Sequence, residues 1–158
     1  MDMMRINWET TIRYCEELAK KIDFRPDIIV GISRGGLVPA RILSDILGVK
    51  KVGILGISFY KGLGETEEKP EITQDLSIDV KGSSILLVDD VADSGKSLKA
   101  AKKYLQDGGI IKTATLHYKP RSEYKPDYFV HSTSAWIVYP WEVHEVERSL
   151  KSDGLKIS

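Results

Sequence analysis

The chain has 158 residues, of which 42% are hydrophobic, so its length and composition suit one globular domain with a substantial core. Lysine and arginine together number 23, as do aspartate and glutamate, so no net charge favours a nucleic acid or a membrane surface as partner. The single cysteine, Cys15, excludes an internal disulfide and a cysteine-rich metal site. No run approaches the roughly 18 apolar residues of a transmembrane helix, and Arg5 interrupts any signal peptide, so we expect a cytoplasmic protein.

Helical and strand periodicities alternate along the chain. Asn7 is a suitable N-cap for a helix over residues 8–22, and this helix has an apolar face made of Trp8, Ile12, Cys15, Leu18, Ala19 and Ile22. Two more helices are predicted, over 37–48, with Leu37, Ala40, Leu43 and Leu47 on one side, and from the loop at 92–95 to about Gln106. Buried strands are predicted over 28–32, 52–60, 84–91 and 110–118, and shorter strands over 71–76, 127–130 and 135–139.

Two segments do not fit this alternation. Residues 61–70 are polar and rich in glycine and glutamate, which predicts a mobile loop, and the tail after Trp141 has room for a short helix. The remaining strands and helices alternate, which is typical of a mostly parallel, twisted sheet covered by helices on both faces. We therefore predict a single α/β domain over residues 1–158.

The most informative segment is ILLVDDVADSGKSL, residues 85–98. An apolar strand ends in two adjacent carboxylates, Asp89 and Asp90, and a short loop with Gly95 leads directly into a helix. Ligands of open parallel sheets lie beyond the carboxyl ends of the strands, and the free amides of a helix N-terminus suit a phosphate. Ser94 and Ser97 add hydroxyl donors.

The two carboxylates distinguish this loop from an ordinary phosphate-binding loop, because they repel phosphate. They could instead accept hydrogen bonds from the hydroxyls of a sugar, with Mg²⁺ bridging the sugar and a second phosphate. Phosphoribosyl pyrophosphate has a phosphate, a vicinal diol and a metal-chelating pyrophosphate, and so satisfies each requirement of the segment.

The same stretch closely resembles the phosphoribosyl-pyrophosphate-binding motif of type I phosphoribosyltransferases. Asp93 to Ser97 correspond to the family's Asp-Thr-Gly-x-Thr loop, with serine in place of both threonines. The resemblance implies Mg²⁺ as cofactor near Asp89 and Asp90, directly or through water, and a role for Asp93 in handling the proton on N7 of a purine. The implied substrate-binding residues are Asp89, Asp90, Val91, Ala92, Asp93, Ser94, Gly95, Lys96 and Ser97.

A second strand–turn–helix unit lies at VGISRGGLVPARIL, residues 30–43. It resembles the pyrophosphate loop of the 6-oxopurine branch of that family, above all the bacterial xanthine–guanine phosphoribosyltransferases. The resemblance implies that Ser33, Arg34, Gly35 and Gly36 bind the leaving pyrophosphate, and that the Ser33–Arg34 peptide is strained or cis.

The end that binds the base is indicated by LHYKP (116–120) and STSAWIVYPWE (132–142). By resemblance, Lys119 contacts the exocyclic 6-oxygen of a purine, Trp136 stacks on its ring and Ile137 offers backbone groups to its other edge. An ammonium donor selects an oxo group over an amino group, and an indole face supplies stacking. Trp141 is expected to serve in packing, and the three histidines, His117, His131 and His144, show no ligand spacing.

The resemblance covers residues 7–142 and also implies a small hood formed by the terminal segments and a homodimer or homotetramer. Residues 143–158 are unmatched. The mobile loop departs from the family, because residues 58–80 contain no arginine and only Lys61 and Lys69 are basic before Lys81.

Two alternatives to a 6-oxopurine enzyme stay open. A protein of this fold could sense phosphoribosyl pyrophosphate as a regulator, although no basic run supports nucleic-acid binding. The acceptor could also be adenine, orotate or uracil. A P-loop kinase and a Rossmann dehydrogenase are disfavoured, since neither glycine-rich motif occurs in the chain.

Overall fold

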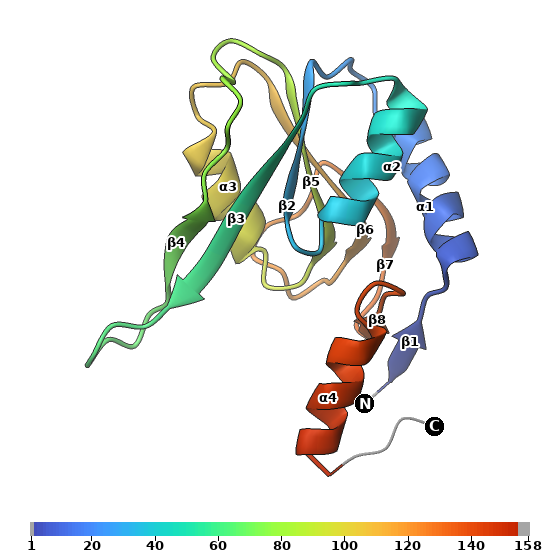
Figure 1. Cartoon of the computed structure of the whole chain (residues 1–158), viewed down its shortest axis with the longest axis vertical. Helices are drawn as coiled ribbons and strands as arrows, with labels where there is room; N and C mark the ends of the chain where they lie inside the picture. Colours follow the sequence, from blue (N-terminus) through green and yellow to red (C-terminus); the bar gives the residue numbers. More distant parts are fainter. Residues whose placement is uncertain (1, 155–158) are drawn as a thin grey trace.

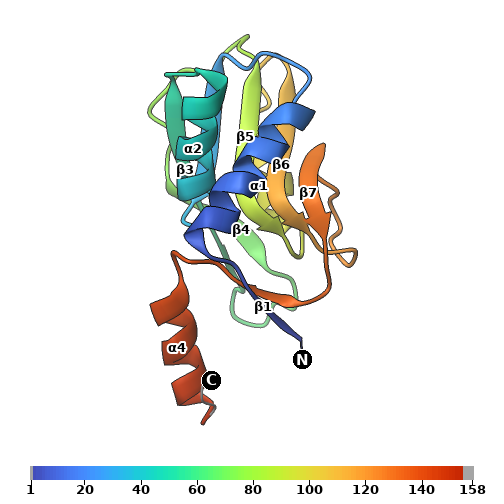
Figure 2. The same ribbon diagram turned by 90° about the vertical axis from the view of Figure 1, so that its right-hand side faces the viewer.

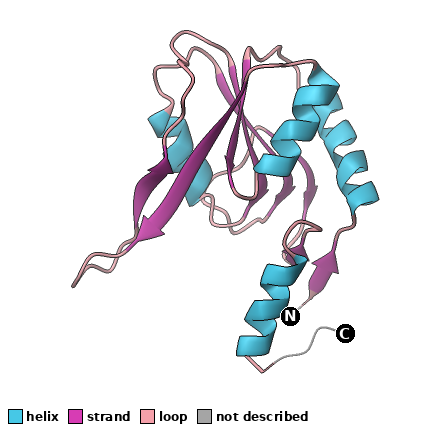
Figure 3. Ribbon diagram, in the orientation of Figure 1, coloured by secondary structure: helices cyan, strands magenta, loops and turns pink. Residues whose placement is uncertain are grey.

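The computed structural model describes residues 2–154, which form a six-stranded sheet, a smaller two-stranded sheet and four helices. The large sheet has the order β4-β3-β2-β5-β6-β7, and only the β3–β4 pair is antiparallel (Figures 1 and 3). Its strands are β2 (Ile28–Ser33), β3 (Val52–Tyr60), β4 (Lys69–Gln74), β5 (Ile85–Ala92), β6 (Ile111–Tyr118) and β7 (Tyr128–Ser132). The predicted mostly parallel α/β sheet is thus confirmed.

Helices cover both faces of this sheet (Figure 1). The helices α1 (Trp8–Lys21) and α2 (Leu37–Leu47) pack on one face, and α3 (Lys96–Tyr104) packs on the other. Alternate residues of the central strands serve the two cores: Ile29 and Leu86 face α1 and α2, whereas Ile28 and Leu87 face the α3 side. A central strand buried on both faces reads as a continuous apolar run, which is why β5 is so evident in the sequence.

A hood lies beyond the carboxyl ends of the central strands (Figure 2). It contains the parallel pair β1 (Met3–Arg5) and β8 (Trp136–Val138), together with α4 (Val143–Ser152). Val138, Val146 and Leu150 form its own small core, with Trp136 and Val143 packed against it. The expected hood of terminal segments is confirmed.

Most predicted elements are present, with differences at particular residues. Asn7 caps α1 by accepting a hydrogen bond from the Thr10 amide, as expected. Trp8 and Ile12 were expected to face inward but are 50% and 47% exposed, because the buried stripe of α1 runs through Thr11, Cys15 and Leu18. Similarly, Leu37 at the start of α2 is exposed, since that first turn projects towards the hood end of the sheet.

Two further differences concern strands. The loop after β3 spans residues 61–68 rather than 61–70, because Lys69 and Pro70 already pair with Tyr60 and Phe59 in the β3–β4 hairpin. Strand β1 was not predicted at all. Within residues 2–154, no helix is long and apolar enough to cross a membrane.

Candidate active site

Strands β2, β5 and β6 are neighbours in the sheet and run parallel, so their carboxyl ends meet at one edge. The loop after β2 carries Ser33 to Gly36, the end of β5 carries Asp89 and Asp90, and Lys119 directly follows β6. The hood lies over this edge and adds residues from β8 and α4. The structure therefore brings together the three segments that were singled out in the sequence.

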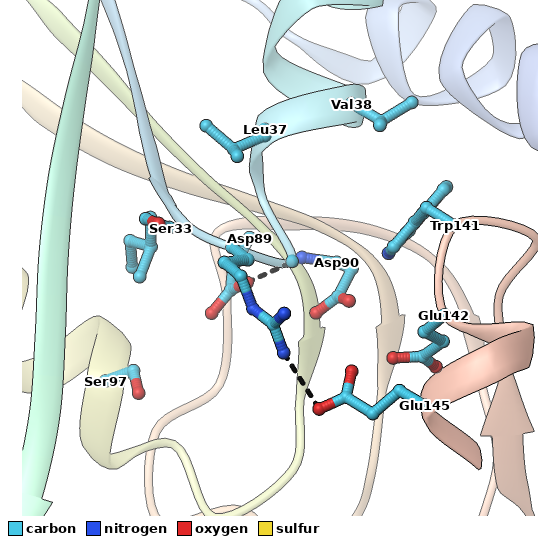
Figure 4. Close-up of a pocket in the computed structure, with 12 residues that line it drawn as sticks. Ser33, Leu37, Val38, Asp89, Asp90, Ser97, Trp141, Glu142 and Glu145 are labelled. Carbon is cyan, nitrogen blue, oxygen red and sulfur yellow. Dashed lines mark hydrogen bonds and ion pairs between the residues drawn. The ribbon is translucent and has the colours of Figure 1, made fainter. Parts of the chain in front are cut away.

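A pocket of about 450 Å³ opens between the first two of these segments and the hood (Figure 4). Ser33, Arg34 and Gly35 line it from one side, and Asp89, Asp90 and Ser97 line it from the β5–α3 side. The hood contributes Trp141, Glu142 and Glu145. The pocket is thus rich in carboxylates, and its lining holds one guanidinium.

Asp89 and Asp90 are held by the adjacent backbone. An Asp89 carboxylate oxygen accepts the Asp90 amide at 2.9 Å, and Asp90 Oδ1 accepts the Val91 amide at 2.8 Å. Burial raises the pKa of Asp89 well above its ordinary value, and the neighbouring charge of Asp90 raises it further. Burial also raises the pKa of Asp90. Two buried carboxyls side by side favour a ligand that neutralises or hydrogen-bonds them.

Close packing fixes the position of Asp90. A Cβ added to Gly35 would come within 2.5 Å of the Asp90 carboxylate, so this position requires glycine. The buried Nε1 of Trp141 has no hydrogen-bond partner among the described residues. It nevertheless lies near enough to the Asp90 carboxylate to lower the pKa of Asp90. The predicted packing role of Trp141 is therefore incomplete, because its ring also lines the pocket.

The loop after β2 has a cis peptide at Ser33–Arg34, as the resemblance implied. The Gly36 amide already donates to the Ile32 carbonyl at 2.8 Å, so it is committed within the loop. The Arg34 guanidinium donates to Glu145 of α4 at 2.8 Å, across the mouth of the pocket (Figure 4). Of this loop, the Arg34 side chain is therefore the group best placed to bind a ligand anion.

The N-terminus of α3 begins at Gly95, which has a φ of +83° and lies tightly against Ser122 and Tyr124. Both features require glycine. Ser94 Oγ accepts the Lys96 amide at 3.3 Å. The Lys96 ammonium lies 3.7 Å from Glu68 of the β3–β4 loop, so it faces this loop, while Ser97 lines the pocket.

A second pocket, of about 540 Å³, lies on the other side of Asp93. Lys119 and Trp136 both line it, as expected for a base site. Lys119 is almost wholly buried, and its Nζ is 3.6 Å from Asp93 Oδ2. Arg121 donates its Nε to Asp93 Oδ1 at 2.8 Å and pairs with the same oxygen through Nη2.

The Ile137 side chain is buried in the main core, so only its backbone can face a ligand. The Trp136 amide donates to the Asp2 carbonyl and the Val138 carbonyl accepts the Ile6 amide, at either end of β1, so the backbone polar groups of Trp136 and Val138 point to that side of the strand. Backbone groups alternate along a strand, so those of Ile137 point to the opposite, unpaired edge of β8. This agrees with the backbone role that the resemblance implied.

Several lining residues were not anticipated from the sequence. Glu145, Leu150 and Asp153 come from the unmatched tail, Arg121 follows Lys119 closely, and Ser134 and Glu142 lie in the segment 132–142, where they were not singled out. The amphipathic pattern of residues 143–152 signals a helix, but nothing local shows that it forms a wall of both pockets.

The carboxyl edge of this α/β sheet thus carries two pockets, one rich in carboxylates and one lined by Lys119 and Trp136, and ligands of open α/β sheets bind at this edge. Residues 7–148 match the model of the phosphoribosyl transferase domain. The chain belongs to this family, which confirms the resemblance seen in the sequence.

Relatives within the family agree with the 6-oxopurine branch. The chain is 31% identical to a xanthine-guanine phosphoribosyltransferase of Ruegeria sp. (strain TM1040), with 87% of this chain and 84% of that protein covered. It is 32% identical to the hypoxanthine-guanine phosphoribosyltransferase of Schizosaccharomyces pombe, with 93% of each covered. A solved purine phosphoribosyltransferase from Pyrococcus horikoshii superposes with a TM-score of 0.82 at 39% identity, covering 89% of this chain and 94% of the other.

Proposed function

We propose that the protein transfers the 5-phosphoribosyl group from phosphoribosyl pyrophosphate to N9 of a 6-oxopurine, which is guanine, xanthine or hypoxanthine. The products are the nucleoside 5′-monophosphate and pyrophosphate. The observation that carries this proposal is the pair of adjacent carboxylates, the partly buried Asp89 and the buried Asp90, at the end of a parallel strand that leads into the N-terminus of α3. The names of the relatives support the same activity.

In this proposal the donor occupies the first pocket. Its ribose hydroxyls hydrogen-bond to Asp89 and Asp90, and its 5′-phosphate binds the loop and helix N-terminus formed by Val91, Ala92, Asp93, Ser94, Gly95, Lys96 and Ser97. Arg34 binds the pyrophosphate with the loop residues Ser33 and Gly35, while Gly36, whose amide donates to Ile32, shapes the loop. On binding, Arg34 exchanges its Glu145 partner for the ligand.

The donor set of this pocket fits Mg²⁺, the cofactor expected for the family. Carboxylate oxygens are preferred magnesium ligands, and Asp89 and Asp90 present two carboxyls to one pocket. Residues 2–154 contain no cluster of three or more histidine, cysteine or acidic residues that could hold a metal alone. Most ligands of the ion would therefore come from the diol and pyrophosphate of the donor, and the ion would supply charge neutralisation to the leaving group.

The purine occupies the second pocket. Trp136 offers a stacking face, Lys119 donates to the 6-oxygen, and the backbone of Ile137 recognises the far edge of the ring. Lys119 is suited to this role because it is almost buried and has few alternative partners, so a 6-amino group would give its ammonium no acceptor on the base.

The reaction is a displacement at C1 of the ribose. The bond between C1 and the pyrophosphate oxygen breaks, the ribose acquires oxocarbenium character, and purine N9 forms the new bond from the opposite face. As N9 attacks, Asp93 takes the proton from N7, so the base of the nucleotide product is neutral. Asp93 lines the second pocket together with Lys119 and Arg121, which supports this role.

We also retain as proposals the expected homodimer or homotetramer and the cytoplasmic location. Light scattering distinguishes a monomer of 17.7 kDa from two or four copies. Cell fractionation with an antibody tests the location.

The activity is tested with a panel of free bases, each incubated with phosphoribosyl pyrophosphate and Mg²⁺ while nucleotide formation is followed. We expect turnover with at least one 6-oxopurine, less with adenine, and none with orotate or uracil. Binding of the donor without nucleotide formation from any base would contradict the proposal and favour a sensor.

A further inference from the structure

A buried chain of polar groups joins the hood to the paired carboxylates. Tyr139, which directly follows β8, is 1% exposed, and its hydroxyl lies 2.8 Å from Nδ1 of His117 and 3.1 Å from the backbone carbonyl of Asp90. His117 lies on β6 and is fully buried. The three groups thus come from three separate segments of the fold.

The distances allow only one assignment of protons that satisfies both contacts. A tyrosine hydroxyl has one proton, and the Asp90 carbonyl can only accept, so the Tyr139 hydroxyl donates to Asp90. It must then accept from His117, which places the imidazole proton on Nδ1. The remaining ring nitrogen, Nε2, is buried without a partner among the described residues, which agrees with a bare lone pair there.

Charge on either side chain would disrupt this chain, and burial disfavours it. Burial lowers the pKa of His117 to about 4, helped by the nearby His131 and Lys119. The His117 ring is therefore neutral near pH 7, as the hydrogen-bond geometry requires.

Asp90 has no paired residue in either neighbouring strand. The ladder between β2 and β5 ends at the Gly31–Val88 pair, and the ladder between β5 and β6 pairs Asp89 and Val91 but not Asp90. Beyond the Gly31–Val88 pair the Tyr139 hydroxyl takes the place of a neighbouring strand. The ring of Tyr139 stacks on Trp141 at 4.7 Å, and Trp141 in turn faces the Asp90 carboxylate.

The same three segments carry the residues assigned to both substrates. Tyr139 lies two residues after Ile137 of the base site, and His117 lies two residues before Lys119. Asp90 belongs to the donor site. On the basis of the proposed function, we infer that His117 and Tyr139 are positioning residues. Their hydrogen-bonded chain holds the main chain at Asp90 and thereby fixes the position of the carboxylate pair that binds the ribose.

The test is Tyr139→Phe, which removes only the hydroxyl. Loss of one buried hydrogen bond at this point is expected to raise KM for phosphoribosyl pyrophosphate about tenfold, with kcat and KM for the base changing less than about threefold. Tyr128→Phe is the matched control, because it removes a phenol that bonds to Asp23, away from the pockets. It should leave all three constants unchanged, even if both variants lose similar thermal stability.

A second pair of variants covers the case in which Tyr139→Phe folds poorly. Asparagine at position 117 can keep an N–H near the place of Nδ1, whereas leucine cannot. We expect His117→Leu to raise KM for the donor several-fold and His117→Asn to restore it most of the way. Nitrogen-15 NMR of the wild type should show a protonated Nδ1 and an unprotonated Nε2 for His117.

The possible failures are distinguishable. If the wild type makes no nucleotide from any base, the proposed function is wrong. If the wild type is active but Tyr139→Phe lowers only its melting temperature, the side chain is merely structural and the inference is wrong. A proton found on Nε2 of His117 would also overturn it, because Tyr139 would then donate to His117 and leave Asp90 without that bond.

Discussion

Nη2 of Arg34 and Oε1 of Glu145 lie 2.8 Å apart, and this ion pair joins the loop after β2 to helix α4, which is 111 residues further along the chain. Both side chains are largely exposed, so the pair itself contributes little to stability. Its position is more informative, because the guanidinium proposed to bind pyrophosphate is already bound to a carboxylate. Pyrophosphate must therefore compete with Glu145 for Arg34.

This competition predicts the effect of Glu145→Gln. Removing the competing charge should lower KM for phosphoribosyl pyrophosphate by up to about fivefold, the upper end of the range expected for an exposed ion pair of about 0.2–1 kcal/mol. Steady-state kinetics at low ionic strength would measure it. Glu147→Gln, two residues further along α4 and near His144, is the control and should have no effect. A rise in KM after Glu145→Gln would show that Glu145 assists binding instead.

Asp93 is predicted to act in turnover more than in binding. Asp93→Asn keeps the shape of the side chain but cannot take the N7 proton, so kcat should fall by about 10²–10⁴-fold. The affinity for phosphoribosyl pyrophosphate, measured by calorimetry with Mg²⁺, should change much less. Asp107→Asn, an exposed aspartate in the turn after α3, is the matched control. Unchanged turnover in Asp93→Asn would remove Asp93 from the mechanism.

The donor site could be predicted well from the sequence because its signals are local. An apolar strand, two carboxylates, a glycine and a helix start all lie within residues 85–98, and the physics of strand ends and helix N-termini applies to such a segment directly. The cis peptide at Ser33–Arg34 is a different case. Only the family resemblance indicated it, since no property of the two residues requires that geometry.

The contributions of the hood could not be predicted, because they depend on contacts between distant parts of the chain. Strand β1 is three residues long and shows no periodicity, and it forms only because β8 lies beside it. The same holds for Glu145, whose partner is far away in sequence. Trp8 follows the helical period of α1, but it is half exposed and is not part of the main core. Its ring lies beside that of Trp141, with the two ring centroids 6.0 Å apart.

Lys119 is predicted to determine the preference for a 6-oxo group. Lys119→Met keeps most of the length and apolar stem of the side chain but removes the donor. We expect kcat/KM for the preferred 6-oxopurine to fall about 100-fold, as for a lost hydrogen bond from a charged group, while that for adenine changes little. Competition assays between the two bases would measure the ratio. Lys125→Met, whose ammonium lies over Tyr118 and Phe129, is the control. An unchanged ratio would place the selection elsewhere.

Because the pKa of Asp89 is raised, we expect its ionised carboxylate to destabilise the ligand-free protein at alkaline pH. A carboxyl whose pKa is higher in the folded than in the unfolded protein stabilises the fold below its unfolded pKa of about 3.8, and this contribution is lost as the pH rises through the folded pKa. Asp89→Asn removes the buried charge, so the variant should melt at a higher temperature than the wild type at pH 8, by about 2–4 °C for each kcal/mol recovered. The difference should shrink towards pH 4.

Comparing Asp89→Asn with the wild type reports on the interacting pair Asp89 and Asp90, because removing one carboxylate also changes the pKa of the other. His117 acts in the opposite sense, because its lowered pKa makes the fold less stable as the pH falls from about 6.5 towards 4, but it is present in both proteins and cancels from the difference. Mg²⁺ with phosphoribosyl pyrophosphate should stabilise the wild type at pH 8 and stabilise the variant much less, since the variant lacks one of the two carboxylates that bind the ribose. Equal stabilisation of both proteins would mean that Asp89 does not contact the donor.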